Sequence, residues 1–289
     1  MSLINGIMVG GVYALVALGW VLIYKCSGVL NLAMGELTLI GAYATLTFYQ
    51  AGIPFIPSII CTLIIGIILG ILVERIFLDK LIGEPILAVI MVTVGLSFFF
   101  KGIIQYIWGT NTRVYTPPIF PLEPIRLGFI KISNVYLWSF IIAILLFVIF
   151  AAFFKYHRWG LAMQATADDE TAALSLGVSA RFVYAGAWAI AFMSAGVGGA
   201  LLGNINGINI SVGYLGLLVL PAVVLGGLNS IPGAILGGIT VGVLQNLSGA
   251  YLDQYFPGGV KEVFPFAFMA VFLLFKPYGF WGWERIERM

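Results

Sequence analysis

Long apolar runs separated by short polar stretches dominate this chain. A helix needs about 20 mainly apolar residues to cross the hydrocarbon core of a bilayer. On that criterion the pattern predicts about nine crossing segments: 3–24, 28–49, 55–74, 85–107, 135–154, 182–203, 213–229, 231–250 and 263–276. Segments 213–229 and 263–276 are short for a full crossing, which predicts tilted or re-entrant helices there. The sequence therefore predicts an all-α polytopic membrane helix bundle with about 8–9 transmembrane segments, some broken or re-entrant, in a single domain over 1–289.

The composition excludes a water-soluble protein of this length. Residues of the AVILMFWYC set make up 61% of the chain, whereas Asp, Glu, Lys and Arg together make up 9%. A soluble domain is about 25% charged. So few charges cannot cover a globule of 289 residues without exposing large apolar patches. The solvent for most of this chain is expected to be lipid.

Two polar stretches, 108–134 and 155–181, are long enough to have a function outside the bilayer. Placing 155–181 in the cytoplasm puts most basic residues inside, as the distribution of Lys and Arg in membrane proteins requires. The basic residues inside are then Lys25, Arg75, Lys80, Lys155, Arg158, Arg181, Lys276, Arg285 and Arg288, against Arg113, Arg126, Lys131 and Lys261 outside. This arrangement predicts an external N-terminus, and 155–181 as a cytoplasmic loop.

Glycines recur at the four-residue spacing that lets membrane helices pack closely. The pairs are Gly6/Gly10, Gly66/Gly70, Gly199/Gly203, Gly233/Gly237 and Gly238/Gly242, and small residues at this spacing predict helix–helix contact. Between Gly226-Gly227 and Gly233 the chain reads Leu-Asn-Ser-Ile-Pro, which predicts a sharp break between two helices. Irregular backbone at membrane depth is tolerated only inside protein or beside a watery cavity. Asn229 and Ser230 are therefore candidates for a substrate pathway.

Few residues are available for catalysis or metal binding. No Lys follows a Gly, so the chain has no phosphate-binding loop with which to hydrolyse ATP. The single histidine, His157, excludes an HExxH zinc site, and Cys26 and Cys61 form no CxxC pair. We expect no catalytic residue, no metal and no cofactor in this chain.

Glu36 is an ionisable residue inside a predicted membrane segment, and Asn31 precedes it. A charged residue near the bilayer centre costs roughly 2.5–3.5 kcal/mol on insertion scales, so its side chain should face the bundle or a cavity. Glu36 is then either a pathway residue, together with Asn31, or a structural acid that hydrogen-bonds its helix neighbours. The sequence leaves both interpretations open.

The stretch 155–181 contains signals for a short helix. Thr166-Ala167-Asp168-Asp169 resembles a capping box, and residues 171–176 support about three turns, with Gly177 as the stop. A helix this short is marginal in water unless it docks on something. Ala172 and Ala173 would let a partner approach closely. The alternative is a helix that lies on its own bundle.

Three blocks in this order resemble the permease subunits of branched-chain amino-acid ABC transporters, the LivH-like group. They are Gly28-Val29-Leu30-Asn31-Leu32-Ala33-Met34-Gly35-Glu36 with Gly41-Ala42-Tyr43, then Gly160-Leu161-Ala162-Met163-Gln164-Ala165-Thr166 through Gly177, and the 226–234 block. Met34 stands where the family usually has His, and Gln164 where it usually has Arg, so no role of those side chains carries over. Thr171-Ala172-Ala173 followed by Gly177 also looks like the Glu-Ala-Ala…Gly coupling loop of ABC permeases, with Thr in place of Glu.

The resemblance implies the function and the partners. It implies a multi-pass inner-membrane permease, not an enzyme, which imports leucine, isoleucine and valine. The implied partners are two ATPase subunits, a second related permease and an external substrate-binding protein. The implied contact with an ATPase comprises Asp169, Glu170, Thr171, Ala172, Ala173 and Gly177. Alternatives are a permease of the same family for urea or short amides and, from another class, an ion-coupled secondary transporter.

Overall fold

The structure is a computed structural model, and it describes residues 1–81, 84–121, 123–127, 130–256 and 259–282. Among these described residues, six helices are long and apolar enough to cross a membrane, one of them continuing beyond its α-helical part: α1 (Ser2–Ser27), α3 (Phe55–Val73), α4 (Ile86–Trp108), α5 (Asn134–Tyr156), α8 (Ala180–Asn206) and α11 (Ile231–Tyr251). Shorter apolar helices lie beside them: α2 (Met34–Gln50), α9 (Ser211–Leu218), α10 (Leu220–Gly226) and α12 (Val260–Phe275). The prediction of an all-α polytopic bundle is confirmed.

Each of the predicted segments contains a helix. The segment predicted at 213–229 is broken: α9 ends at Leu218 and α10 begins at Leu220, with Pro221 in the first turn of α10. Proline has no backbone N–H and fixes its own φ, which suits a helix start and interrupts a helix interior. The segment predicted at 263–276 is a single helix of 16 residues, α12.

Helices α1 and α8 form the centre of the bundle. Both are largely buried, whereas α3, α4 and α5 each expose most of their apolar surface. The exposed side chains of α3 include Ile60, Ile64 and Ile68, which recur at helical spacing and would be costly in water. Such faces suit hydrocarbon, and they agree with the lipid environment that the composition predicts.

Glycine contacts hold the helices together at close range. A Cβ atom on Gly10 of α1 would lie 2.6 Å from the Cα of Ile239 on α11, and one on Gly238 of α11 would lie 2.6 Å from the backbone nitrogen of Ala14. The glycines of each predicted pair lie as close to another helix or segment: Gly70, for example, would place a Cβ 2.5 Å from the Cα of Ala189 on α8. The prediction that these pairs mediate packing is confirmed.

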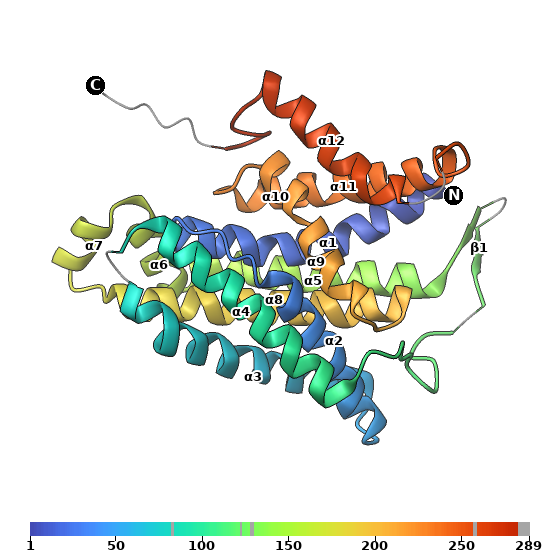
Figure 1. The fold of residues 1–289 in the computed structure, drawn as a ribbon, viewed down its shortest axis with the longest axis horizontal. Coiled ribbons are helices and arrows are strands. Elements are labelled where there is room, and N and C mark those ends of the chain that lie inside the picture. Colours follow the sequence, from blue (N-terminus) through green and yellow to red (C-terminus); the bar gives the residue numbers. More distant parts are fainter. Residues whose placement is uncertain (82–83, 122, 128–129, 257–258, 283–289) are drawn as a thin grey trace.

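The two ends of the bundle differ. Figure 1 shows α6 (Arg158–Asp168) and α7 (Glu170–Ser175) at one end, and the N-terminus at the other end together with the hairpin of β1 (Ile125–Leu127) and β2 (Ile130–Ile132). At the hairpin end, a bridge between Arg113 and Ile208 joins the 108–134 stretch to the residues that follow α8. The two polar stretches of the sequence therefore lie at opposite ends, as the predicted topology requires.

Candidate transport pathway and coupling site

A cleft of about 700 Å³ lies at the end of the bundle that carries α6. Several elements meet around it: the last turn of α1, the start of α4, the end of α6, the first turns of α8, and the turn between α10 and α11. Its walls are partly polar, and the residues that line it include Lys25 and Asp168. A cleft with both charges can accommodate a zwitterion, whose ends need opposite partners.

The break predicted after Gly226 brings Asn229 and Ser230 to this end. Helix α10 ends at Gly226, and α11 begins at Ile231, where the Ser230 hydroxyl accepts a hydrogen bond of 3.1 Å from the backbone N–H of Gly233. Asn229 lines the large cleft. Both Asn229 and Ser230 line a neighbouring cavity of about 310 Å³, together with Gln164. Two of the candidate pathway residues thus face open space.

Asn31 and Glu36 lie elsewhere, and neither lines these cavities. Asn31 is buried in the turn before α2, where its Oδ1 accepts a hydrogen bond of 3.0 Å from the backbone N–H of Ala33. Glu36 is buried in the first turn of α2. Among the described residues, neither the Asn31 Nδ2 nor one carboxyl oxygen of Glu36 has a hydrogen-bond partner.

The helix predicted in the 155–181 stretch is organised differently from the prediction. Thr166 does not cap a helix: its hydroxyl donates to the carbonyl of Ala162 within α6, a helix of 11 residues that the sequence analysis missed. The N-cap is Asp169, whose Oδ1 accepts from the Ala172 backbone N–H at 2.9 Å. The helix it caps, α7, has only 6 residues, so the expectation of about three turns is wrong.

Gly177 ends α7 as predicted. Its φ is 85°, a left-handed conformation that glycine adopts without a Cβ clash. The Val178 N–H donates to the carbonyl of Ala173 at 3.0 Å, and the Gly177 N–H donates to the carbonyl of Leu174 at 3.0 Å, which together make a Schellman motif. The helix stop is therefore fixed by backbone geometry.

The two alanines of α7 face in different directions. Ala172 is exposed, whereas Ala173 is only 2% exposed and packs on the chain itself. The expectation that Ala173 is open to a partner is wrong, because Ala173 is buried where the short helix packs on α6. Thr171 and Ala172 remain accessible.

Asp169 is a titratable group of this segment whose pKa is shifted. The hydrogen bond from the Thr171 hydroxyl at 2.6 Å, and after it the one from the Ala172 N–H, lower the pKa of the Asp169 carboxyl below its ordinary value. Both bonds favour the ionised form. The cap is therefore charged at neutral pH.

Glu74 was not among the residues predicted from the sequence to be functional. It begins the π-helix η1 (Glu74–Leu78), which continues α3 and is followed by the 3₁₀ turn η2 (Asp79–Leu81). Glu74 is 1% exposed and lines a pocket of about 180 Å³ beside the large cleft. The sequence signal for Glu74 was a carboxylate at the end of the apolar run of α3. This signal does not predict burial, because a charged residue at a helix end is usually exposed to solvent. Among the described residues, no group of three or more His, Cys, Asp or Glu is placed to hold a metal ion.

Comparison with known proteins places this chain in a family. The family model described as "Branched-chain amino acid transport system / permease component" matches residues 2–273. The high-affinity branched-chain amino acid transport system permease protein LivH of Salmonella typhimurium is 31% identical over 100% of this chain and 97% of its own length. The protein of the same name from Escherichia coli is 30% identical, and BraD of Pseudomonas aeruginosa 29%, with the same coverage. No solved structure matches.

Membership of this family settles the class of protein. The chain is a multi-pass transport subunit of the inner membrane and not an enzyme, and it works with the other components of an ATP-binding-cassette system. With a family match over nearly its whole length, the chain belongs to the permease components of branched-chain amino acid transport systems.

Proposed function

We propose that this chain is the permease subunit that carries leucine, isoleucine and valine across the membrane in an ATP-driven importer. The observation that carries the proposal is the full-length similarity to relatives named branched-chain amino acid permeases. The cleft with Lys25 and Asp168 supports it, because an amino acid needs a partner of each charge. The whole of 1–289 acts as one transmembrane domain, with 155–181 as its coupling loop.

The lack of a phosphate-binding loop and the position of α7 support the partners that we propose. With no phosphate-binding loop of its own, the subunit needs two separate ATPase subunits. A second related permease completes the pathway, and an external binding protein delivers the amino acid. One ATPase contacts α7 through Asp169, Thr171 and Ala172, and also through Glu170, whose side chain lies outside the described part of the structure. The Gly177 stop holds that helix in position.

Four polar residues form the proposed pathway. Asn229 and Ser230 line open space at the inner end. Asn31 and Glu36 act deeper, where each has a buried polar atom without a partner among the described residues. An unpaired polar group in the bundle is costly, which favours a site that finds its partner in another stage of the transport cycle.

The test is to purify the complex from its native membrane, identify its subunits and bound small molecule, and reconstitute it in liposomes. We expect ATP-dependent uptake of labelled leucine that requires the ATPases and the binding protein, and neither tight ATP binding nor uptake with this chain alone. Uptake of urea or short amides in place of leucine would refute the proposed substrate. Uptake driven by an ion gradient without any ATPase would refute the proposed class.

A further inference from the structure

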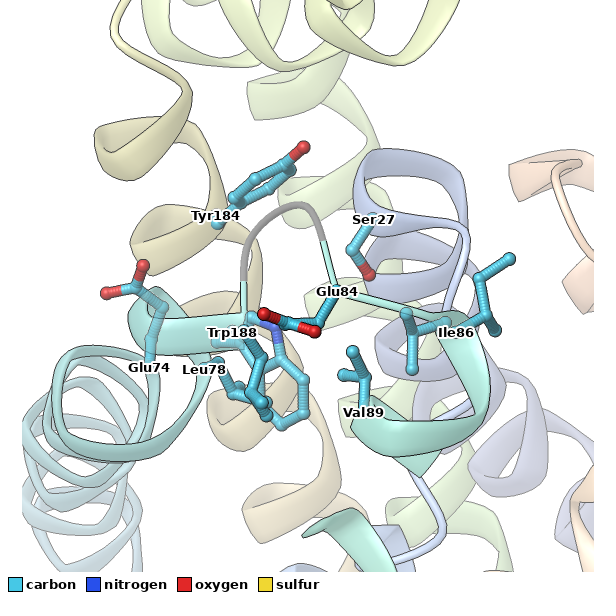
Figure 2. A pocket seen from close by; sticks show the side chains of 10 residues that line it. Ser27, Glu74, Leu78, Glu84, Ile86, Val89, Tyr184 and Trp188 are labelled. Atoms are coloured by element: carbon cyan, nitrogen blue, oxygen red, sulfur yellow. The ribbon is translucent and has the colours of Figure 1, made fainter. Parts of the chain in front are cut away.

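A side pocket of about 180 Å³ lies beside the inner cleft (Figure 2). Ser27, Ile86 and Tyr184 line both spaces, so the pocket adjoins the cleft. In the view of Figure 2 the Tyr184 ring lies above the Glu84 carboxyl group and Trp188 below it, and the Glu74 carboxyl group lies to their left. The pocket thus combines carboxylates, a hydroxyl and aromatic rings.

Glu74 is the unexplained group of this pocket. It is 1% exposed, and neither of its carboxyl oxygens has a hydrogen-bond partner among the described residues. Its charged neighbours are Asp79, Arg181 and Arg75. Arg181 Nε donates to Asp79 Oδ1 at 2.6 Å, and no basic group in the described part of the chain hydrogen-bonds the Glu74 carboxylate. A buried carboxylate without a partner is costly, so this position favours a ligand that supplies one.

The backbone at Glu74 is also irregular. Residues Glu74–Leu78 form a π-helix between the α-helical part of α3 and the 3₁₀ turn. Single π-helical turns are rare within α-helices and occur frequently at functional sites. The widened turn starts at the residue whose carboxylate is unpartnered.

The lining selects the chemistry of the ligand. Besides the two carboxylates and the Ser27 hydroxyl, the walls consist of the Trp188 and Tyr184 rings and aliphatic side chains such as Leu78 and Val89. A calcium ion takes six to eight oxygen ligands, more than this mostly apolar lining offers. Carboxylates with aromatic faces attract an organic ammonium group, and the aliphatic walls suit an apolar substituent.

We propose that this pocket binds the ammonium group and aliphatic side chain of an amino acid as it leaves the pathway on the inner side, with Glu74 as the anionic partner. The identity of the ligand rests on the proposed function, whereas the ammonium chemistry rests on the pocket alone. The carboxylate end of the amino acid points into the cleft, on whose wall Lys25 lies.

The test is calorimetric binding to the intact complex in nanodiscs, without the external binding protein. The probes are leucine, 3-methylbutylamine (leucine without its carboxylate) and 4-methylpentanoate (leucine without its ammonium group). We expect leucine and the amine to bind and the acid not to bind. Glu74→Gln keeps the size of the side chain but removes the charge, and should weaken binding of leucine and of the amine by about tenfold or more.

Two further variants provide controls. Glu84→Gln removes the second, exposed carboxylate and should weaken binding less. Glu123→Gln, at the opposite end of the bundle, should leave all affinities unchanged. Equal amine affinity in wild type and Glu74→Gln, or no amine binding by the wild type, would overturn the proposal. Loss of ATPase subunits from Glu74→Gln with unchanged amine binding would also overturn it, and would indicate a basic side chain of the ATPase as the occupant.

Failure of this proposal is distinguishable from failure of the proposed function. Leucine uptake by the wild-type complex is measured separately. If the complex imports leucine but binds the amine independently of Glu74, only the proposal for the pocket is overturned. If amine binding depends on Glu74 but the complex imports no amino acid, only the proposed function is overturned.

Discussion

The carboxyl group of Glu36 is buried at the start of α2, and one of its oxygens has no partner among the described residues. Ser97 and Lys101 of α4 are its polar neighbours. If Glu36 changes partners during transport, Glu36→Gln should slow leucine uptake by about tenfold or more, because losing a charge-assisted hydrogen bond costs about 1.5–3 kcal/mol. Assembly should be retained, since glutamine has the same shape.

The measurements for Glu36→Gln are uptake by the reconstituted complex and recovery of all subunits on purification, with Glu123→Gln as the matched control. Normal uptake, or failure to assemble, would assign Glu36 a structural role and leave the pathway to Asn229 and Ser230.

The Asp169 cap makes the stability of α7 depend on pH. Since the pKa of Asp169 is lowered in the folded segment by the Thr171 hydroxyl and the Ala172 N–H, its stabilising effect is complete above the ordinary aspartate pKa. The effect should be lost as the pH falls through that lowered value. Amide exchange of residues 170–176, corrected for the intrinsic rate, should therefore rise in acid.

Two Asp169 variants separate capping from charge. Asp169→Asn keeps a capping oxygen but does not titrate, so exchange should become independent of acid. Asp169→Ala removes the cap, and exchange should be fast at every pH. The same acid response in Asp169→Asn as in the wild type would mean that another group controls the helix.

At the scale of elements, α7 offers a direct test of the coupling contact. Ala172→Glu adds bulk and charge to the exposed face, and should reduce ATPase retention and substrate-stimulated hydrolysis without unfolding the bundle. Gly177→Val strains the helix stop by about 1–2 kcal/mol and should have the same effect by misdirecting α7. Unchanged hydrolysis in both variants would show that α7 is only a surface helix.

Ala173→Glu is the contrasting variant on the same helix. Because Ala173 is buried against its own chain, a glutamate there should release α7 from the bundle. Amide exchange over 170–176 should rise in Ala173→Glu and stay low in Ala172→Glu. Equal exchange in the two variants would contradict the docking of α7 through Ala173.

Sequence patterns identified the membrane helices more reliably than the helices of the 155–181 stretch. Apolar runs have one explanation in lipid, so each run contains a helix. The 158–168 stretch has mixed polarity, and its start is capped by the Nδ1 of His157, which accepts from the Trp159 N–H at 3.3 Å. Histidine is outside the usual capping residues, and Thr166 at the far end imitates one. Local signals therefore placed the helix start about two turns too late.

The same limit applies to the site. The break around Asn229 and Ser230 was predictable because glycine and proline punctuate any helix. The burial of Glu74 was not predictable. Its pocket is lined by α8, which is distant in sequence, and by η2, which is an irregular turn. A sequence pattern gives the face of a helix but not the element that covers it.

At the scale of the whole molecule, the N-terminal helix is joined to the C-terminal half through α1 and α11. Gly6 and Gly10 of α1 face Gly238 and Gly242 of α11. Inside this contact the Tyr13 hydroxyl donates a hydrogen bond of 2.5 Å to Gln245 across 232 positions of sequence. The glycine spacing predicted a contact on this face of α1, but nothing local in the sequence specifies α11 as its partner.

The close contact between α1 and α11 predicts different effects for two glycine-to-alanine changes. A Cβ on Gly10 would lie 2.6 Å from the Cα of Ile239, and backbone cannot move aside as a flexible side chain can. Gly10→Ala should therefore separate the helices and destabilise the chain by about 1–3 kcal/mol. Gly102 of α4 has nothing within 4 Å of its Cβ position. There alanine should be neutral or stabilising by about 0.5–1 kcal/mol, its helix-propensity advantage over glycine.

Both variants are measured on one scale by unfolding the purified chain in mixed micelles with increasing concentrations of a denaturing detergent. We expect the midpoint of Gly10→Ala to fall and that of Gly102→Ala to stay or rise. Because both positions lie inside membrane helices and the substitution is the same, propensity contributes equally to the two, and the difference reports the crossing alone. Equal shifts would show that α1 and α11 can separate without cost, and that other contacts hold the N-terminal helix in the bundle.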